Sequence, residues 1–272
     1  MEDFRDKVAV ITGGATGIGF GLAKALGADG AKIVIGEPRQ DRLDEAVAAL
    51  TAEGIEARAT VCDVRDLASV EALADFAWDA FGQVDLVFNN AGVGLGQKRL
   101  VNSEMAAVRN LFEVNFWGVW HGCKVFGERL IKQGTPAAIY NTGSENSLFV
   151  AVPANAAYVA SKHAVLGLTD SLDEEMPDFI RVGVIIPGFV RSEMTTGPFA
   201  DVAMTADDFA EIILKQVRAG ERYCVSHPYN IERVEERMAP IRKAYDNYAP
   251  RYEGDEEHDV RTLIEKVRGK SV

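Results

Sequence analysis

Tyr158 and Lys162 are the two side chains whose spacing most directly suggests acid–base chemistry in this sequence. Residues four apart on a helix share one face, so the phenol and the ammonium would point to the same place. A fixed cation nearby favours phenolate and lowers the tyrosine pKa from its usual value of about 10. A tyrosine held in this way can act as a general base. The alternative is a pair of residues on an ordinary solvated helix face.

A glycine-rich turn lies far upstream, between a predicted strand and a predicted helix. The apolar run Val8–Thr12 is typical of a buried strand, and a helical apolar pattern follows the glycines. Strand, glycine turn and helix together form a pattern that binds the pyrophosphate of a dinucleotide at the helix N-terminus. Gly13, Gly17 and Gly19 are not spaced as G-x-G-x-x-G, so an ordinary strand-to-helix turn stays open as the alternative.

Glu37 directly follows the second predicted strand, 32–36, and lies eighteen residues beyond Gly19. A carboxylate about 20 residues past the glycines hydrogen-bonds the adenosine ribose hydroxyls of NAD. The same charge repels the 2′-phosphate of NADP. Arg39 lies two residues further on and can bind that phosphate, so the sequence predicts a preference for NAD and leaves NADP open.

Several further motifs occur in a fixed order along roughly the first 225 residues. Together with the first ones they are Thr12-Gly13-x-x-x-Gly17-Ile18-Gly19, Asn89-Asn90-Ala91-Gly92, Asn115, Ser144, Tyr158-x-x-x-Lys162 and Pro187-Gly188. In this order and at these intervals the motifs resemble the short-chain dehydrogenase/reductase family, in its shorter, single-domain branch. The stretch from Met1 to about residue 50 also resembles the bacterial Cα-dehydrogenases of lignin aryl-ether breakdown. The resemblance implies an oxidoreductase that transfers a hydride between NAD and a secondary alcohol or ketone.

The resemblance assigns catalytic roles to four residues. Tyr158 is the base, and Lys162 lowers its pKa and binds the nicotinamide ribose. Ser144 orients the substrate oxygen, with Ser147 as the alternative by proximity. Asn115 holds a water that relays protons to Lys162, and a satisfied core asparagine is the alternative there.

The resemblance also implies the cofactor site. The glycine turn cradles the pyrophosphate, residues 63–64 meet the adenine, residues 90–92 lie against the ribose, and the segment from residue 187 holds the nicotinamide carboxamide. For the aspartate in this set, a helix cap or a loop carboxylate is the alternative. The expected cofactor-binding residues are Gly13, Thr16, Gly17, Ile18, Gly19, Glu37, Asp63, Val64, Asn90, Ala91, Gly92, Tyr158, Lys162, Pro187, Gly188, Val190 and Ser192.

Strand and helix patterns alternate along the chain, which predicts an α/β fold with a doubly wound parallel sheet (a Rossmann fold) covered on both faces. Ligands bind at the carboxyl ends of the strands in such a sheet. Strands are expected at 8–12, 32–36, 57–62, 86–89, 138–142, 181–186 and 223–226. Beyond the helix after the glycine turn, helices are expected at 40–53, 67–81, 104–132, 155–175 and 206–219.

The last part of the chain departs from the family, whose usual ending is missing. We therefore expect a dinucleotide-binding catalytic domain at 1–226 and a helical extension at 227–272. Apolar residues at helical spacing predict that the extension packs on its own domain or on a neighbouring subunit of a homodimer or homotetramer. They are Val234, Met238, Ile241 and Tyr245. A plain packing helix is the alternative.

Composition restricts the class of protein. With 272 residues, 47% hydrophobic and 26% charged, the chain reads as one soluble globular α/β domain. Its formal charge of −12 disfavours nucleic acid and anionic membranes as partners. We expect that the charged start Met1–Asp6 is no signal peptide, and an odd number of cysteines, three, is typical of reduced thiols in a cytoplasmic protein. Four scattered histidines show no metal-ligand spacing, so we expect no metal.

The substrate is predicted to be hydrophobic or aromatic, because apolar residues surround the expected site. They are Leu148, Phe149, Val150, Phe189, Met194 and Phe199. Two other functions stay open. An NADP-linked ketone reductase would differ mainly at Glu37 and Arg39, and a non-enzymatic NAD-sensing protein would need a broken set of catalytic residues, whereas all four are present.

Overall fold

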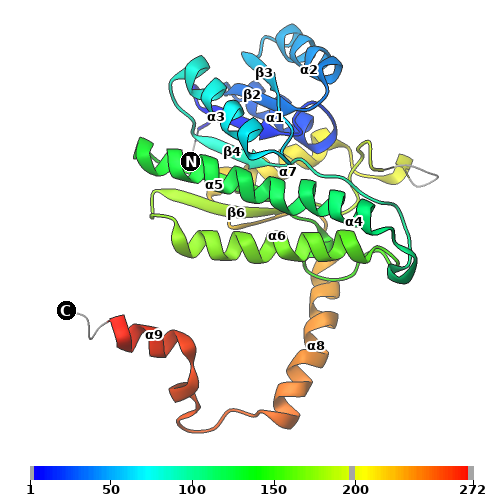
Figure 1. Cartoon of the computed structure of the whole chain (residues 1–272), viewed down its shortest axis with the longest axis vertical. Coiled ribbons are helices and arrows are strands. Elements are labelled where there is room, and N and C mark those ends of the chain that lie inside the picture. The colour runs from blue at the N-terminus through cyan, green and yellow to red at the C-terminus, as the bar shows by residue number, and fades with distance from the viewer. Residues whose placement is uncertain (1–2, 196–199, 269–272) are drawn as a thin grey trace. The chain divides into compact units, whose positions relative to one another are not determined.

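A single seven-stranded parallel sheet forms the centre of the fold in the computed structural model, which describes residues 3–195 and 200–268, the last four of these as backbone only. Its strand order is β3-β2-β1-β4-β5-β6-β7 (Figure 1). The strands are β1 (Val8–Thr12), β2 (Lys32–Glu37), β3 (Ala57–Val61), β4 (Leu86–Asn89), β5 (Ala137–Thr142), β6 (Ile180–Ile186) and β7 (Tyr223–Val225). All seven lie where the sequence predicts a strand: β1 and β4 have the predicted ends, and each of the others differs by one residue at one end.

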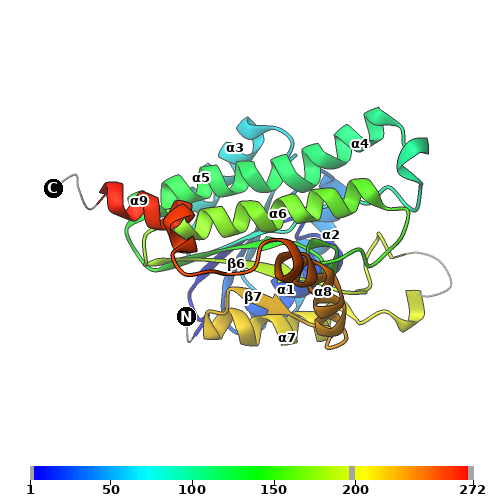
Figure 2. The same cartoon turned by 90° about the horizontal axis from the view of Figure 1, so that it is seen from below.

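Helices cover both faces of this sheet (Figures 1 and 2). On one face lie α1 (Gly17–Ala28), α2 (Gln40–Ala52) and α7 (Ala206–Ala219). On the other lie α3 (Leu67–Phe81), α5 (Gly118–Gln133) and α6 (Ala156–Glu175). The predicted doubly wound α/β fold is therefore confirmed.

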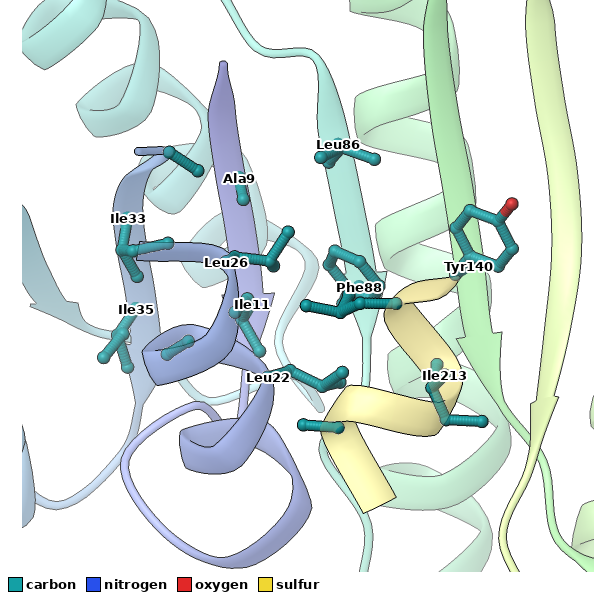
Figure 3. Packing of buried hydrophobic residues seen from close by; sticks show 14 of the residues in the cluster. Ala9, Ile11, Leu22, Leu26, Ile33, Ile35, Leu86, Phe88, Tyr140 and Ile213 are labelled. Atoms are coloured by element: carbon teal, nitrogen blue, oxygen red, sulfur yellow. The ribbon is translucent and has the colours of Figure 1, made fainter. Parts of the chain in front are cut away.

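Successive residues of each central strand point to opposite faces and are buried on both. In β1, Ala9 and Ile11 join the core under α1 and α7, while Val8 and Val10 join the core under α3 and α5. Figure 3 shows the first of these cores, in which Phe88 and Tyr140 of neighbouring strands stack with ring centroids 5.9 Å apart. Burial on both faces explains why these strands read as continuous apolar runs rather than as alternating ones.

The helix predicted at 104–132 differs in the structure, because it is interrupted. It consists of α4 (Met105–Phe112), a turn of π-helix at Glu113–Trp117, and then α5. One extra residue per turn changes the face that the side chains present, and such turns are frequent at functional sites. The apolar spacing of the sequence gives no sign of the insertion. The π turn carries Asn115 into the interior, where it is fully buried.

The chain divides into two compact units, one up to Pro228 and one from Tyr229 onward. The second contains α8 (Asn230–Tyr248), a short 3₁₀ turn at Asp255–His258, and α9 (Val260–Arg268). On α8 the exposed fractions of Met238, Ile241 and Tyr245 are 51%, 41% and 63%. Docking of this helix stays a prediction. Within the described ranges, no helix is both long and apolar enough to cross a membrane.

Candidate active site

The predicted site residues gather at one edge of the sheet, because the carboxyl ends of parallel strands meet there. Gly13 follows β1, Asn90 follows β4, Ser144 lies two residues beyond β5, and Gly188 lies two residues beyond β6. The strand order reverses between β1 and β4, which is the place where a doubly wound sheet binds its ligand.

The glycine turn is built so tightly that no side chain fits in it. Gly13 and Gly17 have φ of +61° and +53°, in the left-handed region that favours glycine. A Cβ on Gly13 would lie 2.9 Å from the Cα of Ala91, and one on Gly19 would lie 2.3 Å from the Gly13 carbonyl oxygen. A Cβ at these positions would fill the turn, so the turn fits a cradle for a pyrophosphate at the start of α1.

Asn90 ties three strands together beside this turn. Its Nδ2 donates to the carbonyl oxygens of Thr12 (3.1 Å) and Gly13 (3.2 Å), and its Oδ1 accepts from Thr142 Oγ1 (3.3 Å). These bonds hold the ends of β1, β4 and β5 in a fixed arrangement. Ser192 reaches the same place from the segment after β6, because a Cβ on Gly17 would lie 3.0 Å from the Ser192 Cβ.

The other expected cofactor-binding residues lie along the same edge of the sheet. Thr16 is the N-cap of α1 but makes no side-chain capping bond, and Ile18 packs against the core. Val64 and Val190 are buried. Gly188 leaves room for His227, whose ring Cγ would lie 2.6 Å from a Cβ at that position.

Asp63 is held by its near neighbour rather than by a helix end. Its carboxylate accepts hydrogen bonds from the backbone N–H and the guanidinium of Arg65, which lower the pKa of Asp63. Asp66 caps α3 instead, accepting from the Ala68 N–H at 3.1 Å. The helix-cap alternative for Asp63 therefore does not apply.

Glu37 is a buried carboxylate at the end of β2, 5% exposed. Its Oε1 accepts from Arg39 Nε at 2.5 Å and from the Arg39 N–H at 3.3 Å. The guanidinium of Arg39 also donates to Glu193 Oε2 at 3.0 Å. Arg39 is thus paired with two carboxylates, and these bonds raise the pKa of its guanidinium.

Ser144 and Tyr158 meet at the centre of the site. The Ser144 side chain lies close enough to the Tyr158 phenol to lower its pKa, and its hydroxyl accepts from the Asn146 N–H at 3.1 Å. Ser147 is used differently, because its Oγ accepts from the Ser144 N–H (3.1 Å) and donates to the Lys162 carbonyl oxygen (2.7 Å). This geometry favours Ser144 over Ser147 as the residue that holds a substrate oxygen.

Lys162 lies one turn along α6 from Tyr158, with its Nζ 5.7 Å from the centre of the tyrosine ring. The ammonium is buried and donates to the Thr142 carbonyl oxygen at 2.8 Å. Burial lowers the pKa of Lys162 to about 8. The Lys162 ammonium is therefore expected to lose its proton under mildly alkaline conditions.

The pKa of Tyr158 differs from the sequence expectation. Burial raises the pKa of the phenol above its ordinary value, the hydrogen bond from Ser144 lowers it, and the nearby carboxylate of Glu145 raises it. The spacing of Tyr158 and Lys162 predicts their shared face, but it carries no information on burial. Glu145, buried beside Ser144, is a residue that sequence reasoning missed, because no pattern distinguishes it from a loop carboxylate.

Asn115 is satisfied within the core and also adjoins Lys162. Its Oδ1 accepts from the Val93 N–H (2.8 Å), and its Nδ2 donates to the Val93 carbonyl oxygen (3.0 Å) and to Ser161 Oγ (3.3 Å). A Cβ built on Gly92 would lie 3.4 Å from Asn115 Oδ1 and 3.7 Å from Lys162 Nζ. The bonds fit the core asparagine, and the proximity fits the relay to Lys162, so that role stays a prediction.

The apolar residues expected around the substrate show varied exposure. Phe149 is buried, whereas Val150, Phe189 and Met194 are 63%, 40% and 50% exposed. Phe199 lies outside the described residues. No group of three or more His, Cys, Asp or Glu side chains in the described part of the chain could hold a metal ion.

Comparison with known proteins agrees with this arrangement. The sequence pattern of the family described as short chain dehydrogenase matches residues 7–203. The chain belongs to this family. The 1-deoxy-11-beta-hydroxypentalenate dehydrogenase of Streptomyces exfoliatus is 36% identical over 229 residues, which are 81% of this chain and 83% of that protein.

Two solved structures that are similar to this chain bear on the cofactor. A short chain dehydrogenase/reductase from Burkholderia phymatum, solved in complex with NAD, has a TM-score of 0.84 and 31% identity, covering 93% of this chain and all of that one. An alcohol dehydrogenase from Thermococcus sibiricus, complexed with 5-hydroxy-NADP, has a TM-score of 0.72 and 30% identity, covering 81% and 95%. Both forms of the cofactor therefore occur among relatives.

Proposed function

We propose that this family oxidoreductase transfers a hydride between NAD and a secondary alcohol or ketone with a hydrophobic or aromatic body. The observation that carries the proposal is the proximity of Ser144 to Tyr158, where the serine lowers the pKa of the phenol, together with the ammonium of Lys162 on the same face of α6. A serine hydroxyl, a phenol and an ammonium at one point can hold an oxygen and move its proton.

The chain's own residues account for the proton and the charge. A bound nicotinamide would supply the hydride chemistry. Ser144 would hold the substrate oxygen where negative charge develops. Because burial raises the pKa of Tyr158, the phenol keeps its proton at neutral pH and can donate it to that oxygen in ketone reduction. In alcohol oxidation the phenolate form of Tyr158 would take the proton of the substrate hydroxyl, and the buried ammonium of Lys162 would stabilise that phenolate.

Preference for NAD is supported by the surroundings of Glu37. A buried carboxylate at the end of β2 suits ribose hydroxyls and repels a 2′-phosphate. Arg39, the residue that would favour NADP, already pairs with Glu37 and Glu193. The NAD complex of the Burkholderia relative supports the same choice. An NADP-linked reductase is the second candidate, supported by the Thermococcus relative with its NADP derivative.

An alcohol substrate is supported by the relative from Streptomyces exfoliatus, whose name describes the dehydrogenation of a hydroxylated compound. The exposed apolar side chains of Val150, Phe189 and Met194 flank the segments that carry Ser144 and Gly188. We further propose a cytoplasmic homodimer or homotetramer without nucleic-acid or membrane partners. The buried free thiols of Cys62, Cys123 and Cys224 and the charge of −12 support this proposal.

Removing the Tyr158 hydroxyl tests the proposal. With NAD and a panel of hydrophobic and aromatic secondary alcohols, we expect Tyr158→Phe to lower kcat by about 100-fold or more, since proton transfer is lost. The affinity for NAD should change little. Tyr223→Phe is a matched control, because its hydroxyl bonds Asp170 at 3.1 Å, away from the site. A Tyr158→Phe enzyme that keeps a tenth of the wild-type kcat would refute the assignment.

A further inference from the structure

Arg39 lies between two carboxylates that come from distant parts of the chain. Glu37 ends β2, and Glu193 lies 154 residues from Arg39 along the chain, in the segment that follows β6. Arg39 Nε bonds Glu37 Oε1 at 2.5 Å, and Arg39 Nη1 bonds Glu193 Oε2 at 3.0 Å and Oε1 at 3.3 Å. The side chain of Glu37 is 6% exposed, whereas that of Glu193 is 46% exposed. Glu193 therefore binds the solvent-facing side of the Arg39 guanidinium.

A second arginine points to the same carboxylate. Arg42, on the first turn of α2, places its Nη2 3.5 Å from Glu193 Oε1, and its Nη1 bonds Glu45 Oε2 at 2.9 Å. Three carboxylates, those of Glu37, Glu45 and Glu193, thus face the two guanidinium groups of Arg39 and Arg42. With Glu45 counted as well, removing Glu193 would leave Glu37 and Glu45 to balance the two arginines, and Arg39 would lose the carboxylate on its Nη1.

We propose that Glu193 is a determinant of the choice between NAD and NADP, because it neutralises the two arginines that a 2′-phosphate would otherwise use. This inference rests on the proposed function, in which Glu37 holds the adenosine ribose. A phosphate beside Glu37 needs guanidinium donors, and a bidentate arginine is the usual partner. Here Arg39 Nη1 is bound to Glu193 and Arg42 Nη2 lies 3.5 Å from it, and the charge of Glu193 itself repels the phosphate.

Glu193 thereby influences cofactor binding from outside the β2–α2 turn, which ordinarily sets the preference between NAD and NADP. Two residues earlier and later in the same segment, Arg191 N–H bonds the Met204 carbonyl oxygen (2.8 Å) and Thr195 Oγ1 bonds the Val190 carbonyl oxygen (2.6 Å). These bonds fix the backbone around Glu193. Removing Glu37 alone would leave Arg39 paired with Glu193. We therefore expect a variant that lacks the carboxylates of both Glu37 and Glu193 to bind NADP better than the two single variants predict.

The experiment measures the dissociation constants of NAD and NADP by titration calorimetry. Four proteins are compared: wild type, Glu193→Gln, Glu193→Gln with Arg39→Gln, and Glu211→Gln. Glu211 is exposed on α7, so its variant changes the net charge equally without touching the two arginines. We expect Glu193→Gln to tighten NADP binding about fivefold, the scale of a half-exposed charge pair, and to change NAD binding less than twofold. The gain should disappear when Arg39 is also replaced.

The outcomes distinguish a failure of this inference from a failure of the proposed function. If the wild type binds NAD but Glu193→Gln leaves the NADP to NAD ratio unchanged, Glu193 is not a determinant and the proposed function stands. An equal gain in Glu211→Gln would show a general charge effect and would also overturn the inference. Wild-type protein that binds neither nucleotide would remove the proposed function itself.

Discussion

Lys162 is a cation held in the protein interior, and this placement has a thermodynamic cost. Burial lowers its pKa from the ordinary 10.5 to about 8, which corresponds to roughly 3 kcal/mol at neutral pH. One hydrogen bond to the Thr142 carbonyl oxygen satisfies only part of the ammonium. A residue placed for chemistry is therefore expected to reduce the free energy of unfolding.

Replacing Lys162 with methionine removes this cost, so in the absence of nucleotide we expect the Lys162→Met protein to gain stability at pH 7 relative to wild type. Between pH 8 and 10.5 the folded wild type binds fewer protons at Lys162 than the unfolded chain, so its stability at this site rises with pH. The advantage of the variant should thus shrink over that range. Chemical denaturation at several pH values measures it.

Lys215→Met is the control for this comparison, because Lys215 is exposed on α7. Its effect on the free energy of unfolding should be small and should not follow the same pH course. A stability difference for Lys162→Met that is constant from pH 7 to 10 would contradict the buried-cation account. Turnover should fall in the Lys162 variant whatever its stability, since the ammonium also serves the reaction.

At the level of single residues, the sequence predicts where the site residues lie but not the electrostatic environment around them. The four-residue spacing places Tyr158 and Lys162 on one face of α6, and the glycines mark positions where a Cβ would clash. The electrostatic environment depends on long-range packing, which no local pattern reveals. Burial raises the pKa of Tyr158 for that reason, and the partners of Arg39 include Glu193, 154 residues away.

At the level of elements, two glycines of α5 provide a matched pair. Gly122 faces β4, and a Cβ there would lie 1.9 Å from the Oδ1 of Asn89. Asn89 cannot move freely, because its Nδ2 donates to Asn141 Oδ1 at 2.8 Å inside the core. At Gly127 the nearest atom would be the Cε of Met176 at 3.7 Å, an ordinary contact.

We therefore expect opposite effects of alanine at the two positions. Gly122→Ala should destabilise the protein by about 2 kcal/mol, since it overpacks the core and disturbs the asparagine pair. Gly127→Ala should stabilise it by about 0.5 kcal/mol, since alanine favours helix without a clash. Urea unfolding of both variants measures the two effects. Equal effects at both sites would mean that α5 adjusts its position and that the contact with β4 is not rigid.

The elements themselves follow closely from the sequence, with one instructive exception. Apolar runs give the central strands of the sheet because both of their faces are buried, and α3 and α7 begin and end where the pattern predicts. The π turn at Glu113–Trp117 is not predictable in this way, because an insertion of one residue into a long helix preserves local helical composition. It takes tertiary contacts, here those of Asn115 with Val93, to reveal it.

At the level of the whole molecule, the part after Pro228 is the least determined by family resemblance. We propose that residues 1–226 form the catalytic domain and that 227–272 form a helical extension that docks on that domain or on a second subunit. On α8 the exposed fractions of Met238, Ile241 and Tyr245 are 51%, 41% and 63%, so three large apolar side chains lie along one face of the helix. Exposure of such a stripe to water is unfavourable, which supports the proposal that this face docks.

Charged substitutions in this stripe test the proposal on the full chain. Met238→Asp combined with Ile241→Asp should lower the assembled mass in light scattering or raise the substrate KM, because a carboxylate in an apolar contact must be desolvated. Asn247→Asp adds a charge on the opposite side of α8 and should change neither quantity. Ending the chain at Pro228, the last residue of the first compact unit, should give the same change while NAD binding persists. Unchanged mass together with unchanged kinetics in both altered proteins would show that the extension contributes neither to the assembly nor to the active site.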